Sequence, residues 1–163
     1  MDATEDVRVI NLPNLLTAKL GGQPGEGIME ELLKNAEAKV QELAADYLTW
    51  VGGDLKTLEG VVDDLVPGSP RMAELLLRAR DILHNMKGNG TTFGYDLITQ
   101  IAQSGSDILR KRETIDESRR EALRHHVAAL RVVLDKKISG PGGEPGKRLV
   151  NRLQAIAAPF GQD

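Results

Sequence analysis

Apolar residues recur at steps of three and four along most of this chain, which is the period of an amphipathic helix. The pattern predicts helices over residues 28–51, 55–66, 70–92, 95–112, 114–138 and 147–158. Gly52-Gly53 interrupts the first two of these stretches, so they form either one kinked helix or two helices, the second capped by Asp54. Short connections between the later helices imply antiparallel neighbours. The sequence therefore predicts an all-α protein.

Two helix starts carry recognisable capping signals. Ser69 is a good N-cap and is followed by Pro70, a residue favoured at the first helical position. Thr114 is followed three residues later by Glu117, which is a capping-box pattern. These signals place two of the expected helix starts at residues 70 and 114.

Two segments rich in glycine and proline, residues 21–27 and 140–146, are typical of flexible linkers. The first lacks the Lys-Ser/Thr ending of a phosphate-binding loop. We therefore expect three regions: an N-terminal extension and linker (1–27), a helical core (28–138), and a linker with a short C-terminal helix (139–163). Within the extension, residues 7–20 are predicted to form a short extended piece and a helical turn that lie across the core as a lid.

The composition of the chain favours a helical domain and excludes several classes of function. A chain of 163 residues fits one domain with its own core, and only 3% aromatic residues favour helices packed through Leu, Ile, Val and Ala. A net charge of -3 gives no basic face for nucleic acid, and the lack of cysteine excludes disulfides and thiol chemistry. We found neither a signal core nor a run of about 18 apolar residues, so we expect no membrane segment and a cytoplasmic location.

Chemistry-bearing residues gather in the segment from His84 to Gly94. His84 falls away from the apolar stripe of its predicted helix, and Lys87 and Gly88 lie one turn further on the same outer face. An imidazole ordinarily has a pKa of about 6.5 and can accept a phosphoryl group when neutral. Lys87 would neutralise phosphoryl oxygens, and Gly88 would leave room for a second protein.

The pattern His-x-x-Lys-Gly, with Phe93 and then Gly94 ten residues after His84, resembles the signature of histidine-containing phosphotransfer (HPt) domains. The resemblance covers about residues 28–138. It implies an antiparallel four-helix bundle with additional short N- and C-terminal helical segments, and it favours one long kinked helix at Gly52-Gly53. His84 would lie on the outside, about midway along its helix. Asn89 and Gly90 depart from the Ser or Ala usual in the family, which predicts a less regular helix there.

The resemblance also implies a function in two-component signal transduction. A response-regulator receiver domain, alone or within a hybrid histidine kinase, would pass its phosphoryl group from aspartate to His84, and the phosphohistidine would pass it to another receiver. Lys87 would stabilise the phosphoryl group, while the receiver would supply Mg²⁺, so the chain needs no metal, cofactor or ATP of its own. Such a protein is a monomeric phosphorelay intermediate rather than a turnover enzyme or kinase.

Candidate docking residues surround His84 in the predicted helices. Leu77, Arg80 and Asp81 lie one or two turns before it, although a neighbouring helix could instead cover Leu77. Gln103 and Ser106 lie on the outer side of the next helix, where they either approach the phosphoryl group or are simply solvated. Gly90 and Gly105 are small enough to let helices approach closely around the site.

Other features have simpler interpretations. His125 and His126 are adjacent, so they point about 100° apart on a helix and lack the spacing of metal ligands. Tyr47 and Trp50 are expected to pack in the core or under the lid rather than to dock a partner. Two rival functions remain open: a bundle that binds receivers as an adaptor without transferring phosphate, and a purely structural helical protein. An autonomous histidine kinase is excluded because no ATP-binding domain fits in the remaining residues.

Overall fold

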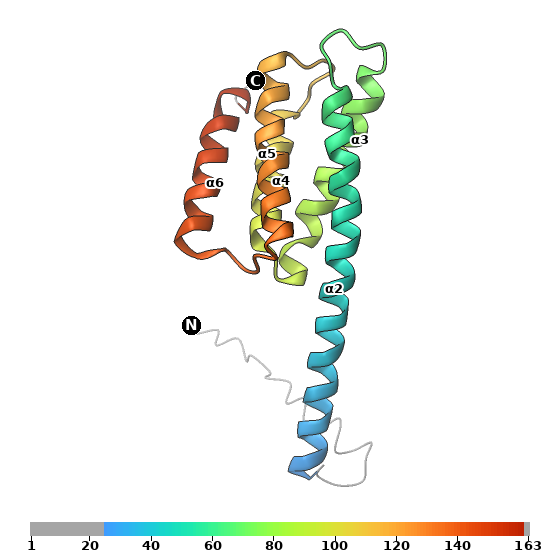
Figure 1. The fold of residues 1–163 in the computed structure, drawn as a ribbon, viewed down its shortest axis with the longest axis vertical. Helices are drawn as coiled ribbons and strands as arrows, with labels where there is room; N and C mark the ends of the chain where they lie inside the picture. The colour runs from blue at the N-terminus through green and yellow to red at the C-terminus, as the bar shows by residue number, and fades with distance from the viewer. Residues whose placement is uncertain (1–24, 162–163) are drawn as a thin grey trace, which may run out of the picture. The chain divides into compact units, whose positions relative to one another are not determined.

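The computed structural model describes residues 25–161, and this part of the chain is all-helical, without strands (Figure 1). Its α-helices are α2 (Glu26–Asp64), α3 (Met72–Asn89), α4 (Asp96–Ile108), α5 (Glu117–Asp135) and α6 (Gly143–Ala157). Two short 3₁₀ helices follow α3 and α6, at Thr91–Phe93 and Ala158–Phe160. The prediction of an all-α fold is confirmed. The predicted lid over residues 7–20 lies outside the described residues.

Helix α2 runs without a break through Gly52-Gly53, so the two-helix alternative is wrong. Glycine disfavours a helix by about 1 kcal/mol relative to alanine. Here, buried Val51 and Leu55 flank the pair at helical spacing and pack into the core. Tertiary packing therefore keeps the helix continuous where local propensity would end it.

The chain divides into two compact units, one ending at Glu42 and the other starting at Leu43. The described part of the first unit is the start of α2, where every side chain is exposed. Its exposed large apolar residues are Ile28, Met29, Leu32, Leu33 and Val40.

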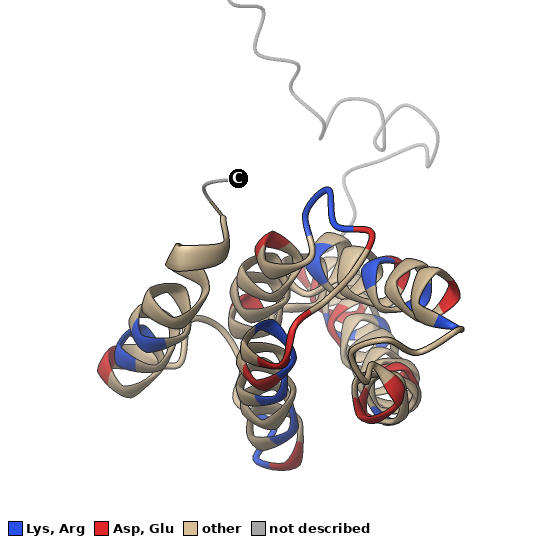
Figure 2. Ribbon diagram, turned by 90° about the horizontal axis from the view of Figure 1, so that it is seen from above, with Lys and Arg blue, Asp and Glu red and all other residues tan. Residues whose placement is uncertain are grey.

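The second unit has a core made mostly of Leu, Ile, Val and Ala, as the composition predicted. Helix α4 lies at its centre and packs against α3, α5 and α6. Polar contacts tie α5 to the end of α2: Arg131 bonds both carboxylate oxygens of Glu59 at 2.9 and 2.7 Å, and Arg120 donates to the carbonyl oxygens of Val62 and Asp63. Acidic and basic residues are interspersed along the helices (Figure 2).

Aromatic residues are few, but three of them form one cluster. The Tyr47 ring on α2 stacks on Phe93 at 4.7 Å and on Tyr95 at 5.8 Å between centroids. Tyr47 is therefore a core residue, as predicted. Trp50, by contrast, is 61% exposed, so it does not pack in the core, and the predicted lid that could cover it lies outside the described residues. Trp50 lies three residues from Tyr47, about 60° around the helix axis, at the edge of the buried stripe.

Several helix ends differ from the predictions by two to four residues. Helix α3 begins at Met72 rather than residue 70, although Ser69 Oγ accepts a hydrogen bond from the Arg71 backbone N–H at 3.3 Å. It ends at Asn89 rather than residue 92. Helix α4 ends at Ile108, four residues before the predicted end.

Helix α5 is capped by Asp116 and not by Thr114. The Asp116 carboxylate accepts a hydrogen bond from the Arg119 backbone N–H at 2.8 Å, which is the ordinary N-cap interaction. The helix then ends at Asp135 instead of continuing to residue 138. The predicted capping box was therefore misplaced by two residues.

Helix α6 begins at Gly143, so residues 140–146 are not the flexible linker predicted from their composition. Gly142 has φ of +68°, and Gly146 is buried where an added Cβ would lie 3.1 Å from Leu97 Cδ2 on α4. The Gly140 N–H donates to Gly94 O at 2.6 Å, which fixes this segment beside the start of α4. Glycine here permits tight packing rather than flexibility. The domain boundaries after residues 27 and 138 stay predictions.

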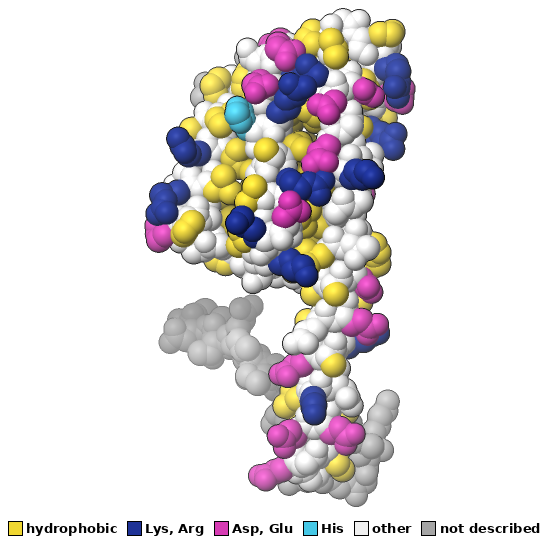
Figure 3. Space-filling model, viewed as in Figure 1, with side chains coloured by type: hydrophobic (Ala, Val, Ile, Leu, Met, Phe, Trp, Pro, Cys, Tyr) yellow, Lys and Arg dark blue, Asp and Glu magenta, His cyan; other side chains and the backbone are white. Residues whose placement is uncertain are grey.

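Val150, Leu153 and Ala157 of α6 are buried in the same core as α4 and α5. Between α5 and α6 the surface is hollowed into an apolar groove of about 480 Å³, where hydrophobic side chains gather in the space-filling view (Figure 3). Helix α6 is thus an integral part of the second unit and not a detached element.

Candidate phosphotransfer site

His84 is exposed on the outer side of α3, away from the buried stripe. The buried residues of the helix match the predicted stripe: Met72, Leu75, Leu76, Ala79, Ile82, Leu83 and Met86. Because α3 ends at Asn89, His84 lies in its last two turns and not midway along it. Its imidazole makes no hydrogen bond or ion pair with any residue between 25 and 161.

His84 lines a surface groove of about 350 Å³ formed by α3, α4 and the segment that follows α4. The groove is lined by Arg80, Asp81, His84, Lys87, Gln103, Ser106, Asp107, Leu109, Arg110 and Lys111. The structure therefore brings together most of the residues singled out in the sequence. Leu77 and Gly88 do not line this groove.

Thr99 of α4 holds the end of α3 in place. Its Oγ1 donates to Lys87 O at 3.2 Å and accepts from the Thr91 N–H at 2.9 Å. The approach is close because Gly90 is buried against this side chain: an added Cβ there would lie 2.9 Å from both Thr99 N and Tyr95 O. The predicted close approach at Gly90 is confirmed, and the α-helix gives way to a 3₁₀ turn just after it.

Lys87 and Gly88 differ in their surroundings. Lys87 is half-buried at the groove, and its ammonium forms no ion pair within the described part of the chain. Gly88 is exposed, and an added Cβ would meet no atom within 4 Å. The glycine thus leaves open surface one turn beyond His84, as expected.

The predicted docking residues are partly engaged within the protein. The Arg80 guanidinium donates to Leu109 O and Arg112 O, so it binds backbone rather than standing free. The Gln103 amide donates to Asp107 Oδ1 at 3.1 Å, and the Ser106 hydroxyl donates to Ala102 O at 2.8 Å.

The remaining docking candidates are more accessible. Asp81 is exposed at the groove. Leu77 is 59% exposed, so no helix among residues 25–161 covers it, and it lies outside the groove lining.

A buried polar pair between α4 and α5 was not expected from the sequence. Ser104 Oγ lies 2.8 Å from His126 Nε2, and His126 Nδ1 lies 2.7 Å from Ala122 O. Burial lowers the pKa of His126 and favours its neutral form. A signal was present: His126 is three residues after Leu123 and four before Leu130, on the apolar stripe of α5.

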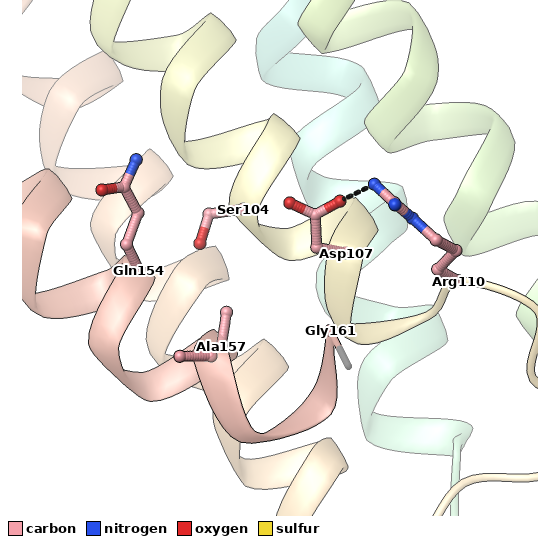
Figure 4. A pocket seen from close by; sticks show the side chains of 7 residues that line it. Ser104, Asp107, Arg110, Gln154, Ala157 and Gly161 are labelled. Carbon is pink, nitrogen blue, oxygen red and sulfur yellow. Dashed lines mark hydrogen bonds and ion pairs between the residues drawn. The ribbon is translucent and has the colours of Figure 1, made fainter. Parts of the chain in front are cut away.

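Ser104 also borders a second cavity of about 280 Å³ beside α6, with Gln154 and Ala157 on the facing helix (Figure 4). Asp107 and Arg110 form an ion pair at one edge of it. His126 itself is fully buried, and the hydroxyl of Ser104 is engaged with it. His126 and Ser104 thus satisfy each other's buried polar groups, and His126 has no access to solvent.

No group of three or more His, Asp or Glu residues among residues 25–161 could hold a metal ion. Across the same range, every helix is too short or too polar to cross a bilayer.

No protein-family model, curated protein or solved structure matches this sequence.

Proposed function

We propose that this chain is a histidine phosphotransfer protein that carries a phosphoryl group on His84 between receiver domains. The observation that carries the proposal is the exposed imidazole of His84 at the groove that also holds Lys87, with open surface at Gly88. A nucleophile, a cation and steric access are the elements that phosphoryl transfer between two proteins needs.

In the proposed step, the lone pair of a neutral His84 imidazole nitrogen attacks the phosphorus of a receiver phosphoaspartate. The new N–P bond forms as the acyl O–P bond breaks, and the aspartate leaves as a carboxylate. The second ring nitrogen keeps its proton, and the reverse reaction passes the group to another receiver. The Lys87 ammonium would neutralise the phosphoryl oxygens throughout.

The proposal extends to the fold and the partners. The part of α2 from residue 43 onward, with α3, α4 and α5, would form the antiparallel four-helix bundle of such proteins, and α6 would add a fifth helix. The partners would be response-regulator receivers, alone or in a hybrid histidine kinase, in the cytoplasm. The receiver would contribute Mg²⁺, and this chain would act as a monomer without cofactor.

The test is to incubate the protein with receiver domains from the same genome, phosphorylated with radiolabelled acetyl phosphate. We expect acid-labile, base-stable label on the parent protein and none on His84→Gln. His125→Gln is the matched control because His125 is also exposed, on α5. It should accept label like the parent.

The same experiment separates the rival functions. If His84→Gln accepts label as well as the parent does, His84 is not the acceptor and the proposal is wrong. A parent protein that binds the receivers but never takes label would be an adaptor instead.

A further inference from the structure

The Arg80 guanidinium fastens the segment after α4 to α3. Its Nε and Nη2 donate to Leu109 O at 3.1 and 2.8 Å, and Nη2 also donates to Arg112 O. One side chain thus holds two carbonyl groups that lie three residues apart. The planar fork of arginine suits this arrangement, whereas lysine presents a single charged nitrogen.

Lys111 lies between the two carbonyl groups that Arg80 holds, and its backbone has φ of +53°. Residues other than glycine rarely adopt this left-handed conformation, and they keep it where the surrounding contacts impose it. Lys111 is exposed and lines the same groove as His84. The loop is therefore fixed in a strained form that brings a lysine to the proposed phosphotransfer site.

Four cations line the groove, and two of them are already engaged. Arg80 binds the carbonyl groups, and Arg110 forms an ion pair with Asp107. Lys87 and Lys111 form no ion pair with any residue from 25 to 161. Lys87 lies one helical turn from His84, whereas Lys111 comes from a different element and is fully on the surface.

We propose that Lys111, held in place by Arg80, is a docking cation that binds an acidic side chain of the phosphodonor protein. The inference rests on the proposed function and names a residue that selects the partner. Lys87 is placed to serve the phosphoryl group, and an exposed lysine on a loop is placed to meet a protein surface. A charge at the rim of an interface acts mainly on the rate of association and on its salt dependence.

The test compares two phosphodonors on the parent, Lys111→Glu and the control Lys147→Glu. Lys147 is an exposed lysine on α6 that does not line the groove. The first donor is a phosphorylated receiver domain, which must dock; the second is potassium phosphoramidate, which is too small to need docking.

We expect Lys111→Glu to slow transfer from the receiver by about tenfold at low ionic strength, and by less at high salt. Labelling by phosphoramidate should not change, and Lys147→Glu should match the parent with both donors. Equal receiver transfer by Lys111→Glu and the parent would overturn the docking role while leaving the proposed function intact. Equal slowing with both donors would also overturn it, since Lys111 would then act on the phosphoryl group. A parent that neither donor labels would instead reject the proposed function.

The positioning role of Arg80 is tested with Arg80→Ala alone and combined with Lys111→Glu. If Arg80 acts by holding Lys111, the double variant transfers no more slowly than Lys111→Glu alone. Arg80→Lys should not rescue receiver transfer, because it cannot hold both carbonyl groups. Additive losses in the double variant would show that Arg80 acts independently of Lys111.

Discussion

The Ser104 hydroxyl on α4 lies 2.8 Å from Nε2 of His126 on α5, and both side chains are buried. A carbonyl oxygen can only accept, so His126 Nδ1 donates its proton to Ala122 O at 2.7 Å. Nε2 is then the acceptor for the Ser104 hydroxyl. The neutral imidazole is thus fully hydrogen-bonded inside the core, which leads to two predictions about stability.

The first prediction concerns pH. Burial lowers the pKa of His126 in the folded protein below the value of about 6.5 expected when the chain unfolds. As the pH falls below about 6.5, the unfolded chain takes up a proton that the folded core resists, so the free energy of unfolding falls. Above that pH both states are neutral, and this dependence disappears.

Urea unfolding at about pH 7.5 and about pH 5.5 measures the effect. His126→Gln should be less stable at both pH values but should lose part of the pH dependence. His125→Gln, which changes an exposed neighbour, should keep it. An unchanged pH dependence in His126→Gln would assign the effect to other groups.

The second prediction is that Ser104→Ala destabilises the protein by about 1–3 kcal/mol, because His126 Nε2 becomes a buried acceptor without its donor. Ser106→Ala is a suitable control because Ser106 donates only to a carbonyl group of its own helix and is less buried. Urea midpoints of the three proteins compare the losses. Equal losses would mean that the pairing with His126 contributes nothing special.

The third prediction contrasts Gly88 with Gly90. Gly88→Ala should stabilise the protein by up to about 1 kcal/mol, because alanine favours the helix and the added Cβ meets nothing. Gly90→Ala should destabilise it by about 1–3 kcal/mol, because its Cβ would collide with Thr99 and Tyr95 O. Thermal or urea unfolding distinguishes the two, and a stabilised Gly90→Ala would contradict the close approach.

A larger substitution at Gly88 tests the proposed function without changing the stability of the fold. Gly88→Gln should fold like the parent, yet its side chain would occupy the open surface beside His84. Transfer from a phosphorylated receiver should therefore slow, while the circular dichroism spectrum and melting temperature stay close to those of the parent. Undiminished transfer in Gly88→Gln would show that the docked partner does not approach this surface.

The fourth prediction concerns Lys87. Lys87→Ala should slow phosphoryl transfer by about tenfold, the factor that corresponds to a loss of ~1.4 kcal/mol in transition-state stabilisation. Phosphohistidine should also decay faster in this variant. Both rates are measured by following label on the purified protein, and no change in either would remove Lys87 from the site.

Much of the fold was predictable because the apolar stripes of the helices are regular. The stripe of α3 and the outward position of His84 both follow from helical spacing. Glycine was harder to interpret, since its meaning depends on packing. Gly52-Gly53 lies inside a continuous helix, and Gly146 lies in the first turn of α6, because neighbouring side chains determine both.

In the site, too, features within one helix were predictable from the sequence, whereas contacts between different elements were not. His84 and Lys87 share a helix, so their common face follows from the sequence alone. Lys111 comes to the groove through a left-handed backbone conformation and the hydrogen bonds of Arg80. The spacing of apolar residues in the sequence does not predict this contact between Arg80 and the loop that carries Lys111. The role of His126 was readable from its place on an apolar stripe, but its partner Ser104 depends on how α4 packs on α5.

The exposure of Trp50 has a practical consequence. It is the sole tryptophan of the chain, so it supplies an intrinsic fluorophore at one known place on α2. Because its indole is largely in water, global unfolding should shift its emission little. Covering of this part of α2 by another protein would move the emission to shorter wavelength, and the unlabelled protein thus carries its own optical sensor for association along that helix.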